Sequence, residues 1–71
     1  MLSAEERKFL RKKLPKGYGK LIAKEAGLTE ASVSFWFSGR HNSEEVEVIA
    51  LRLFQEYKEV MRKRREILLQ P

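Results

Sequence analysis

Cysteine is absent from this 71-residue chain, and proline, glycine and aromatic residues are few. Without cysteine, a fold held by disulfide bonds and a thiolate nucleophile are both excluded. The single histidine excludes a cluster of imidazole ligands, and no acidic set has metal-binding spacing, so we expect no metal and no cofactor. No apolar run is long enough to span a membrane, and the charged start "MLSAEERKFL" is not typical of a signal peptide. These absences together predict a soluble, cytoplasmic protein without a membrane partner.

Basic residues are what the sequence has in excess. Lys and Arg number 15 against 10 Asp and Glu, which gives a formal net charge of +5. Such an excess favours a polyanionic partner such as nucleic acid, although many small proteins are mildly basic without one. The length allows one small domain with a thin core and leaves no segment for a ligand-sensing domain. No nucleophile stands with a positioned base, so we predict that the protein is not an enzyme and takes no small-molecule ligand.

The first periodic segment predicts a helix over 3–14, and no segment of the chain has the pattern of a strand. Ser3 and Glu6 have the spacing of a capping box, in which each side chain satisfies a free backbone amide. Pro15 ends this helix because it disfavours helical geometry in the residue before it. The apolar stripe expected to face the core is Phe9, Leu10 and Leu14. The basic residues expected to cover the rest of the helix are Arg7, Lys8, Arg11, Lys12 and Lys13.

Two further short helices are expected in the middle of the chain. The connector "KGYG", residues 16–19, leads into a helix over 20–26, which Gly27 closes as a left-handed residue. Thr29 then caps a third helix that runs to about Ser38. The side chains expected to form a small core between these helices are Ile22, Ala23, Ala26, Leu28, Val33 and Trp36.

A long fourth helix is expected at the C-terminal end. Asn42 or Ser43 would cap it, and no residue breaks the helical pattern before Pro71, so it would have about 26 residues and a length of about 39 Å. Some of its apolar residues also recur in steps of three and four, which is typical of a coiled-coil seam. That seam would contain Ala50, Leu53, Tyr57, Val60, Arg64 and Ile67, and the charged Arg64 interrupts it. Alternatively, the first half of the helix packs on the domain and the second half frays. The run "RKRR" would also complement the helix C-terminus or add nonspecific affinity for DNA.

The stretch "IAKEAGLTEASVSFWFSGR", residues 22–40, resembles the Cro and phage-repressor-like family of helix-turn-helix DNA-binding domains, and also the headpiece of lac-type repressors. The resemblance implies an all-α fold, a compact four- to five-helix bundle that contains a helix-turn-helix and has a long C-terminal helix. It divides the chain into a DNA-binding domain over 1–57 and a basic helical extension over 58–71. It also implies sequence-specific binding of double-stranded DNA by a small stand-alone phage or bacterial transcriptional regulator. The recognition helix, about 30–38, would enter the major groove of DNA, and the C-terminal helix would join two copies in a homodimer.

Carried over residue by residue, the resemblance implies which side chains touch DNA. The expected contacts with base edges are made by Glu30, Ala31, Ser34 and Phe35. The resemblance places Thr29 and Ser32 near phosphates. Residues that border the expected DNA-binding groove are further candidates for phosphate contacts. These further candidates are Lys16, Gly19, Lys20, Arg40, His41 and Asn42.

Two residues depart from the pattern of that family. Phe35 stands where the family often has Arg or Gln, and Gly19 stands where it often has Gln, so neither side chain makes the usual hydrogen bond. Phe35 would still contact a thymine methyl, and Glu30 would accept a hydrogen bond from a cytosine amine. The backbone N–H of Gly19 would still bind a phosphate at a helix N-terminus.

The three consecutive rings of Phe35, Trp36 and Phe37 cannot all face one core, because a helix turns by about 100° per residue. Val33, Trp36 and Phe37 share one face, so we expect Trp36 behind the motif, Phe37 towards the fourth helix and Phe35 outside. A rival interpretation is a protein-interaction adaptor that keeps the fold without reading bases, and Glu30 and Phe35 favour it. A third is a basic helical RNA-binding protein, for which the sequence has no module signature.

Overall fold

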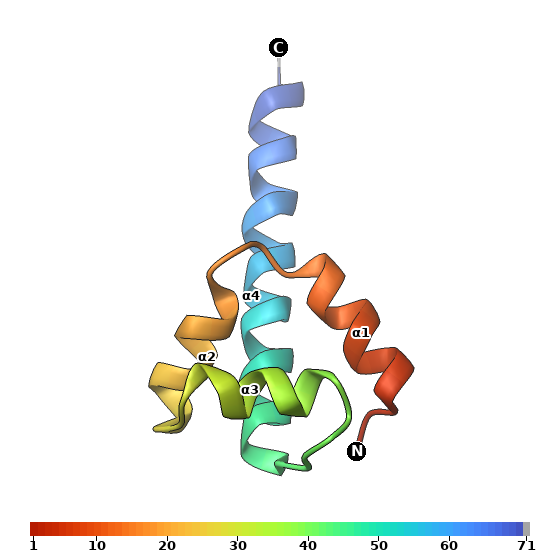
Figure 1. The fold of residues 1–71 in the computed structure, drawn as a ribbon. Helices are drawn as coiled ribbons and strands as arrows, with labels where there is room; N and C mark the ends of the chain where they lie inside the picture. Colours follow the sequence, from red (N-terminus) through yellow and green to blue (C-terminus); the bar gives the residue numbers. More distant parts are fainter. Residues whose placement is uncertain (71) are drawn as a thin grey trace.

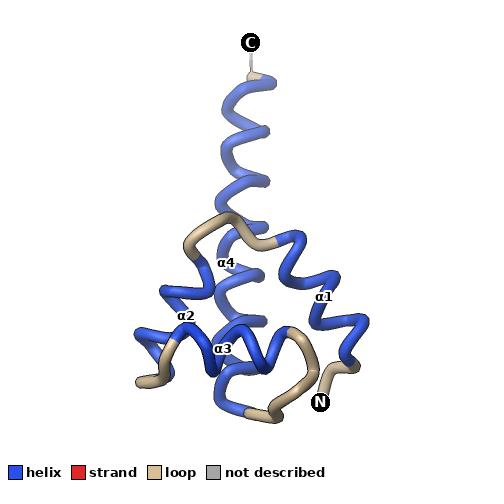
Figure 2. The backbone as a smooth tube through the Cα atoms, in the orientation of Figure 1, coloured by secondary structure: helices blue, strands red, loops and turns tan. Residues whose placement is uncertain are grey.

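The structure is a computed structural model that describes residues 1–70, and this part of the chain is all-helical (Figures 1 and 2). Its elements are α1 (Ala4–Lys13), α2 (Tyr18–Ala26), α3 (Glu30–Phe37) and the long α4 (Glu44–Leu69). The sequence allowed four or five helices, and the described residues form four. Of the predicted extension 58–71, the last residue, Pro71, lies outside the described residues.

Side-chain caps fix where three of the helices begin. The Ser3 hydroxyl accepts a hydrogen bond from the Glu6 amide at 3.1 Å, and the Glu6 carboxylate accepts one from the Ser3 amide at 2.8 Å. The predicted capping box is therefore confirmed. Thr29 caps α3 as predicted, and α4 is capped by Ser43, which settles the choice between Asn42 and Ser43.

The second helix begins earlier than the sequence predicted. We expected it at residue 20, after a loose connector, but α2 begins at Tyr18 and Gly19 is helical. Gly17 makes the early start possible because its φ of 96° lies in the left-handed region that glycine adopts at low cost. Gly27, with a φ of 69°, ends α2 as predicted, and a three-residue turn leads to α3.

The core surrounds Trp36 and receives side chains from all four helices. Val33, Trp36 and Phe37 are at most 4% exposed, and Phe35 is 46% exposed, so the predicted burial of Trp36 and Phe37 and the predicted exposure of Phe35 are confirmed. The buried apolar residues are Leu10, Ile22, Ala23, Val33, Trp36, Phe37, Val46, Ala50 and Leu53.

Three apolar side chains lie elsewhere than the sequence predicted. Phe9 is 61% exposed, because α1 turns Leu10 and not Phe9 to the core. Leu28 is 40% exposed, since it lies in the turn after α2, where only its backbone amide is held by the Ala23 carbonyl. Phe37 lies against the Arg11 guanidinium of α1, whereas we expected it to reach the fourth helix.

Arg7 was expected on the solvent side of the first helix, but it is only 4% exposed. Its Nε donates to the Leu2 carbonyl at 2.9 Å, and its Nη1 donates to the carbonyls of Trp36 and His41 at 3.0 and 3.2 Å. Its Nη2 donates to Asn42 Oδ1 at 3.0 Å, and its guanidinium carbon lies 4.8 Å from the centre of the Trp36 ring. Arg7 therefore ties α1 to the end of α3 and to the loop that precedes α4.

The last part of α4 projects beyond the other three helices (Figure 1). The predicted coiled-coil seam is wrong in its first half, because Ala50 and Leu53 are buried in the core of their own domain. Tyr57 packs edge-on against Tyr18 of α2, with ring centres 6.0 Å apart. The side of α4 that faces the core is covered by the other helices up to Tyr57. Only after Tyr57 is this side of α4 open to another molecule.

Ion pairs support the outer surface of α4. Arg52 pairs with Glu25 of α2, which joins these two helices. Further along α4, Arg62 pairs with Glu59 and Glu66 at helical spacing, and its guanidinium lowers the pKa of Glu59. Such pairs between neighbouring turns favour the helix where no other element covers it.

Candidate functional site

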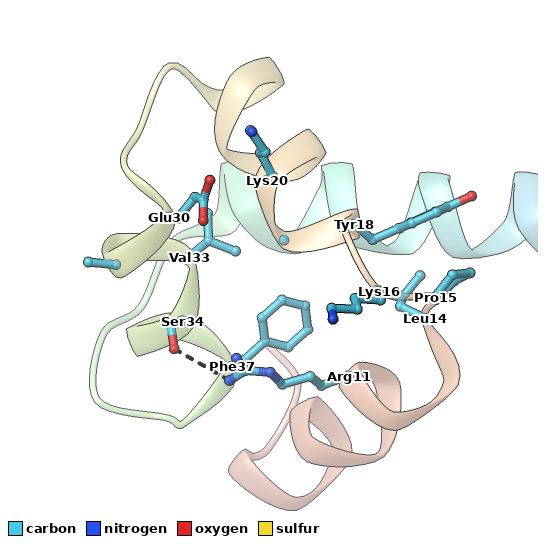
Figure 3. Close-up of a pocket in the computed structure, with 13 residues that line it drawn as sticks. Arg11, Leu14, Pro15, Lys16, Tyr18, Lys20, Glu30, Val33, Ser34 and Phe37 are labelled. Atoms are coloured by element: carbon cyan, nitrogen blue, oxygen red, sulfur yellow. Dashed lines mark hydrogen bonds between the residues drawn. The ribbon is translucent and has the colours of Figure 1, made fainter.

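A groove lies between α3 and the segment in which α1 passes into α2 (Figure 3). Figure 3 shows the Phe37 ring between the two walls, and Val33 is a second apolar residue of the lining. Because both residues also belong to the core, the groove has a fixed, packed floor. Its walls carry polar and charged side chains from elements far apart in the sequence.

Half of the residues predicted to touch DNA line this groove. From the segment between α1 and α2 come Lys16, Gly19 and Lys20, and from α3 come Glu30, Ala31 and Ser34. The fold therefore brings three of the predicted base contacts next to three of the predicted phosphate contacts. These two sets of residues lie close together because α2 and α3 are joined by a turn of only three residues and pack against each other.

The remaining residues of α3 lie outside the groove. Phe35 is exposed but does not line the groove. Thr29 and Ser32 stand at the start of α3 with their hydroxyl oxygens 3.0 Å apart, and the Thr29 hydroxyl also accepts the Ser32 amide at 3.1 Å. The bond between the two hydroxyls is exposed, and the Thr29 hydroxyl serves as the helix cap.

The loop between α3 and α4 holds the last three predicted residues, away from the groove lining. Arg40 and His41 are exposed. Asn42 uses its amide oxygen to accept a hydrogen bond from Arg7, which leaves its NH2 group as the part of the side chain open to a ligand. Because Arg7 also binds the His41 carbonyl, this loop is anchored to α1.

Arg11 is a residue of the groove that sequence reasoning missed. Its Nη1 donates to the Ser34 hydroxyl at 3.4 Å, and its guanidinium carbon lies 5.6 Å from the centre of the Phe37 ring (Figure 3). The sequence offers no signal for this role, since Arg11 is one of several basic residues in the last turn of α1. Only the packing of α1 against α3 brings it to the groove.

The charge of the groove is predominantly positive. Arg11, Lys16 and Lys20 line it, and Glu30 is its one acidic residue within residues 1–70. The N-terminus of α2 also opens here, and it has neither a capping side chain nor an acidic residue in its first turn. The other three helices each begin with a side-chain cap and at least one acidic residue. The groove therefore combines cationic side chains with the positive end of an uncapped helix.

In the part of the chain that the structure describes, residues 1–70, no three His, Cys, Asp or Glu side chains are grouped so that they could hold a metal ion. None of its helices combines the length and apolar character needed to cross a membrane.

Comparisons with protein-family models, with curated proteins and with solved structures found no match for this chain. The resemblance of residues 22–40 to Cro-like domains therefore depends on their own types and spacing.

Proposed function

We propose that this protein binds double-stranded DNA sequence-specifically, through a helix-turn-helix made of α2, the turn 27–29 and α3. The observation that carries the proposal is the groove, where the uncapped N-terminus of α2 and three cationic side chains face the polar side of α3. Such a surface suits a polyanion, and the polar residues of α3 beside it suit the edges of bases. The excess of basic residues over the whole chain supports the same partner.

A phosphate of the DNA backbone would bind at the start of α2. The first amides of a helix have no partner inside it, and α2 has no side chain to satisfy them. The backbone N–H groups of Gly19 and Lys20 would donate to a phosphate oxygen, and the absence of a Cβ on Gly19 would let the backbone approach closely. Lys16 and Lys20 would add their charges, and Arg11 would reach a neighbouring phosphate.

The exposed side of α3 would then face base edges in the major groove of DNA. Glu30 would accept a hydrogen bond from a cytosine amine, Ala31 would contact a thymine methyl, and Ser34 would bond to either kind of base. Phe35 follows Ser34 directly in α3, and it would contact a thymine methyl at the edge of the interface between α3 and DNA. The shared groove favours Glu30, Ala31 and Ser34 as the central contacts.

In the cell such a domain would act as a small transcriptional regulator that works as a homodimer. One recognition helix reads only a few base pairs, and two half-sites about one helical turn of DNA apart supply the missing specificity. We propose residues 1–57 as the DNA-binding part and 58–71 as the part that serves association.

The proposal is tested by fluorescence anisotropy of labelled duplexes in a series of salt concentrations. Affinity should fall steeply, by about 10³-fold, between about 50 and about 200 mM salt. Lys16→Ala/Lys20→Ala should reduce the slope of log affinity against log salt by about 2, because two phosphate contacts are lost. The matched control is Lys12→Ala/Lys13→Ala, which removes the same charge from exposed residues of α1 outside the groove. Equal slopes for the two variants would mean that net charge alone attracts DNA, and the proposed site would be wrong.

One observation favours the adaptor as a second candidate. The Phe35 ring is 46% exposed and lies outside the groove, as a contact residue for another protein would. If Phe35→Ala leaves both the melting temperature and duplex binding unchanged, the adaptor explains this ring better than a base contact does.

A further inference from the structure

A second groove, on the surface between α1 and α4, is apolar and separate from the site already described. Phe9 of α1 and Leu51 of α4 line it, and they are 61% and 42% exposed, with Phe54 beside them. The only charged residues of its lining, within residues 1–70, are Glu5 and Glu6. We refer to it as the α1–α4 groove. It presents large apolar side chains to solvent beside an acidic edge, which marks a surface for a partner.

A further exposed apolar surface is the end of α4. Ile67, Leu68 and Leu69 are 68%, 81% and 81% exposed, and they follow the basic run "RKRR" after one acidic residue, Glu66. We refer to residues 62–69 as the tail. Within residues 1–70, Arg62 is the one member of the basic run that takes part in an ion pair. The tail therefore combines a basic segment with an uncovered apolar end, which is the complement of the α1–α4 groove.

We propose that the tail of one copy occupies the α1–α4 groove of a second copy, and that the exchange is reciprocal and forms a closed dimer. The leucines of the tail would cover Phe9 and Leu51, and its arginines would approach Glu5 at the acidic edge. The tail cannot fill its own groove, because α4 is one continuous helix and the 18 residues from Leu51 to Leu69 span about 27 Å. A second copy is the occupant that this chain itself supplies.

A dimer with two-fold symmetry fills the α1–α4 groove of each copy with the tail of the other. If two α4 helices run antiparallel with the symmetry axis near residue 60, Leu51 of each helix lies opposite Leu69 of the other. Leu51 and Leu69 also share one side of α4, since 18 residues are five full turns of a helix with 3.6 residues per turn. The two leucines therefore face the same partner helix, as an isologous interface requires. This interface replaces the predicted seam, whose first half is buried in the core.

The proposal rests on the proposed role of residues 58–71 in association but not on DNA binding. It is therefore tested on the full chain without DNA, by sedimentation velocity over a range of concentrations, so its failure leaves the proposed recognition of DNA untouched. The groove variant is Phe9→Ser/Leu51→Ser, and the tail variant is Leu68→Ser/Leu69→Ser. All four side chains are exposed, so the variants should fold, which is checked by their thermal melts. The matched control is Val48→Ser, which changes an apolar residue of α4 that is 58% exposed and does not line the groove.

We expect the unchanged chain to form a dimer that neither the groove variant nor the tail variant forms, with dissociation constants raised at least tenfold. Val48→Ser should dimerise normally. A mixture of the groove and tail variants should form heterodimers more readily than either variant forms homodimers, because one intact tail then meets one intact groove. A monomeric unchanged chain, or a groove variant that still dimerises while the tail variant does not, would overturn the proposal. Oligomers that grow beyond the dimer would refute the reciprocal exchange.

Discussion

Replacing Arg7 by methionine should destabilise the domain more than any other change at a charged residue of α1. The guanidinium is 4% exposed and donates to three backbone carbonyls and to the Asn42 side chain. Methionine would occupy a similar volume, but each of these acceptors would lose the donor that Arg7 supplies. The largest loss is the bond to the Trp36 carbonyl, because this bond is buried, although that carbonyl keeps the hydrogen bond from the Gly39 amide at 3.1 Å.

The magnitude follows from the individual contacts. A buried hydrogen bond to a charged group contributes about 1.5–3 kcal/mol, and a desolvated cation over a tryptophan ring contributes about 0.5–2 kcal/mol. The other three bonds are only partly buried, so water would replace much of their contribution. Removing the guanidinium also removes the cost of its desolvation. The net loss should be about 2–4 kcal/mol, a large part of the roughly 4–10 kcal/mol expected for a chain of this length.

Urea unfolding followed by tryptophan fluorescence measures this loss, because Trp36 is the only tryptophan and is fully buried. Lys8→Met is the matched control, since it removes the same charge from an exposed neighbour on α1. Arg7→Lys should lose most of the stabilisation as well, because one ammonium group cannot reach four acceptors in a planar fork. If the free energies of unfolding of Arg7→Met and Lys8→Met differ by less than about 0.5 kcal/mol, the hydrogen bonds of Arg7 do not stabilise the fold as we expect.

Thermal melts should separate the rings, with Trp36→Ala losing about 3–5 kcal/mol and Phe35→Ala keeping nearly its full melting temperature. Gly39→Ala should destabilise the fold, because φ is +83° and the new Cβ would meet a side chain of α1 at 2.9 Å; unchanged urea unfolding would contradict this. The hydrogen bonds from Ser3 lower the pKa of Glu6 in the folded state, so the stability that the ionised carboxylate adds is present above the usual glutamate pKa range and is lost as the pH falls through the lowered pKa. In Glu6→Gln the free energy of unfolding should therefore fall less as the pH is lowered. If urea unfolding shows the same fall with pH for the unchanged chain and for the variant, the prediction is wrong.

The sequence predicted the local features of the fold well because their causes are local. The capping box at Ser3, the Thr29 cap and the end of α2 at Gly27 each depend on residues within one turn of a helix. The inward face of α3 followed from helical spacing alone. The start of α2 was missed because two glycines normally indicate a loop, whereas Gly17 uses its left-handed conformation to begin the helix.

The groove could be predicted only in part because it is a tertiary feature. Its α2 and α3 residues are close in sequence and came from the resemblance, but Arg11 enters from α1 and gave no signal. The buried position of Arg7 was missed for the same reason, since its partners Trp36, His41 and Asn42 are 29 to 35 residues away. Phe9 has a core-like residue type, and only the packing of α1 places it in an exposed groove.

The proposed sequence-specific recognition of DNA is tested most directly by selection from a pool of random DNA duplexes, with the bound fraction sequenced. If α3 reads base edges and the protein acts as a dimer, one consensus of a few base pairs should be enriched. That consensus should occur as an inverted pair with centres about 10 base pairs apart. Retention of duplexes with no enriched sequence, or no retention at low salt, would contradict the account.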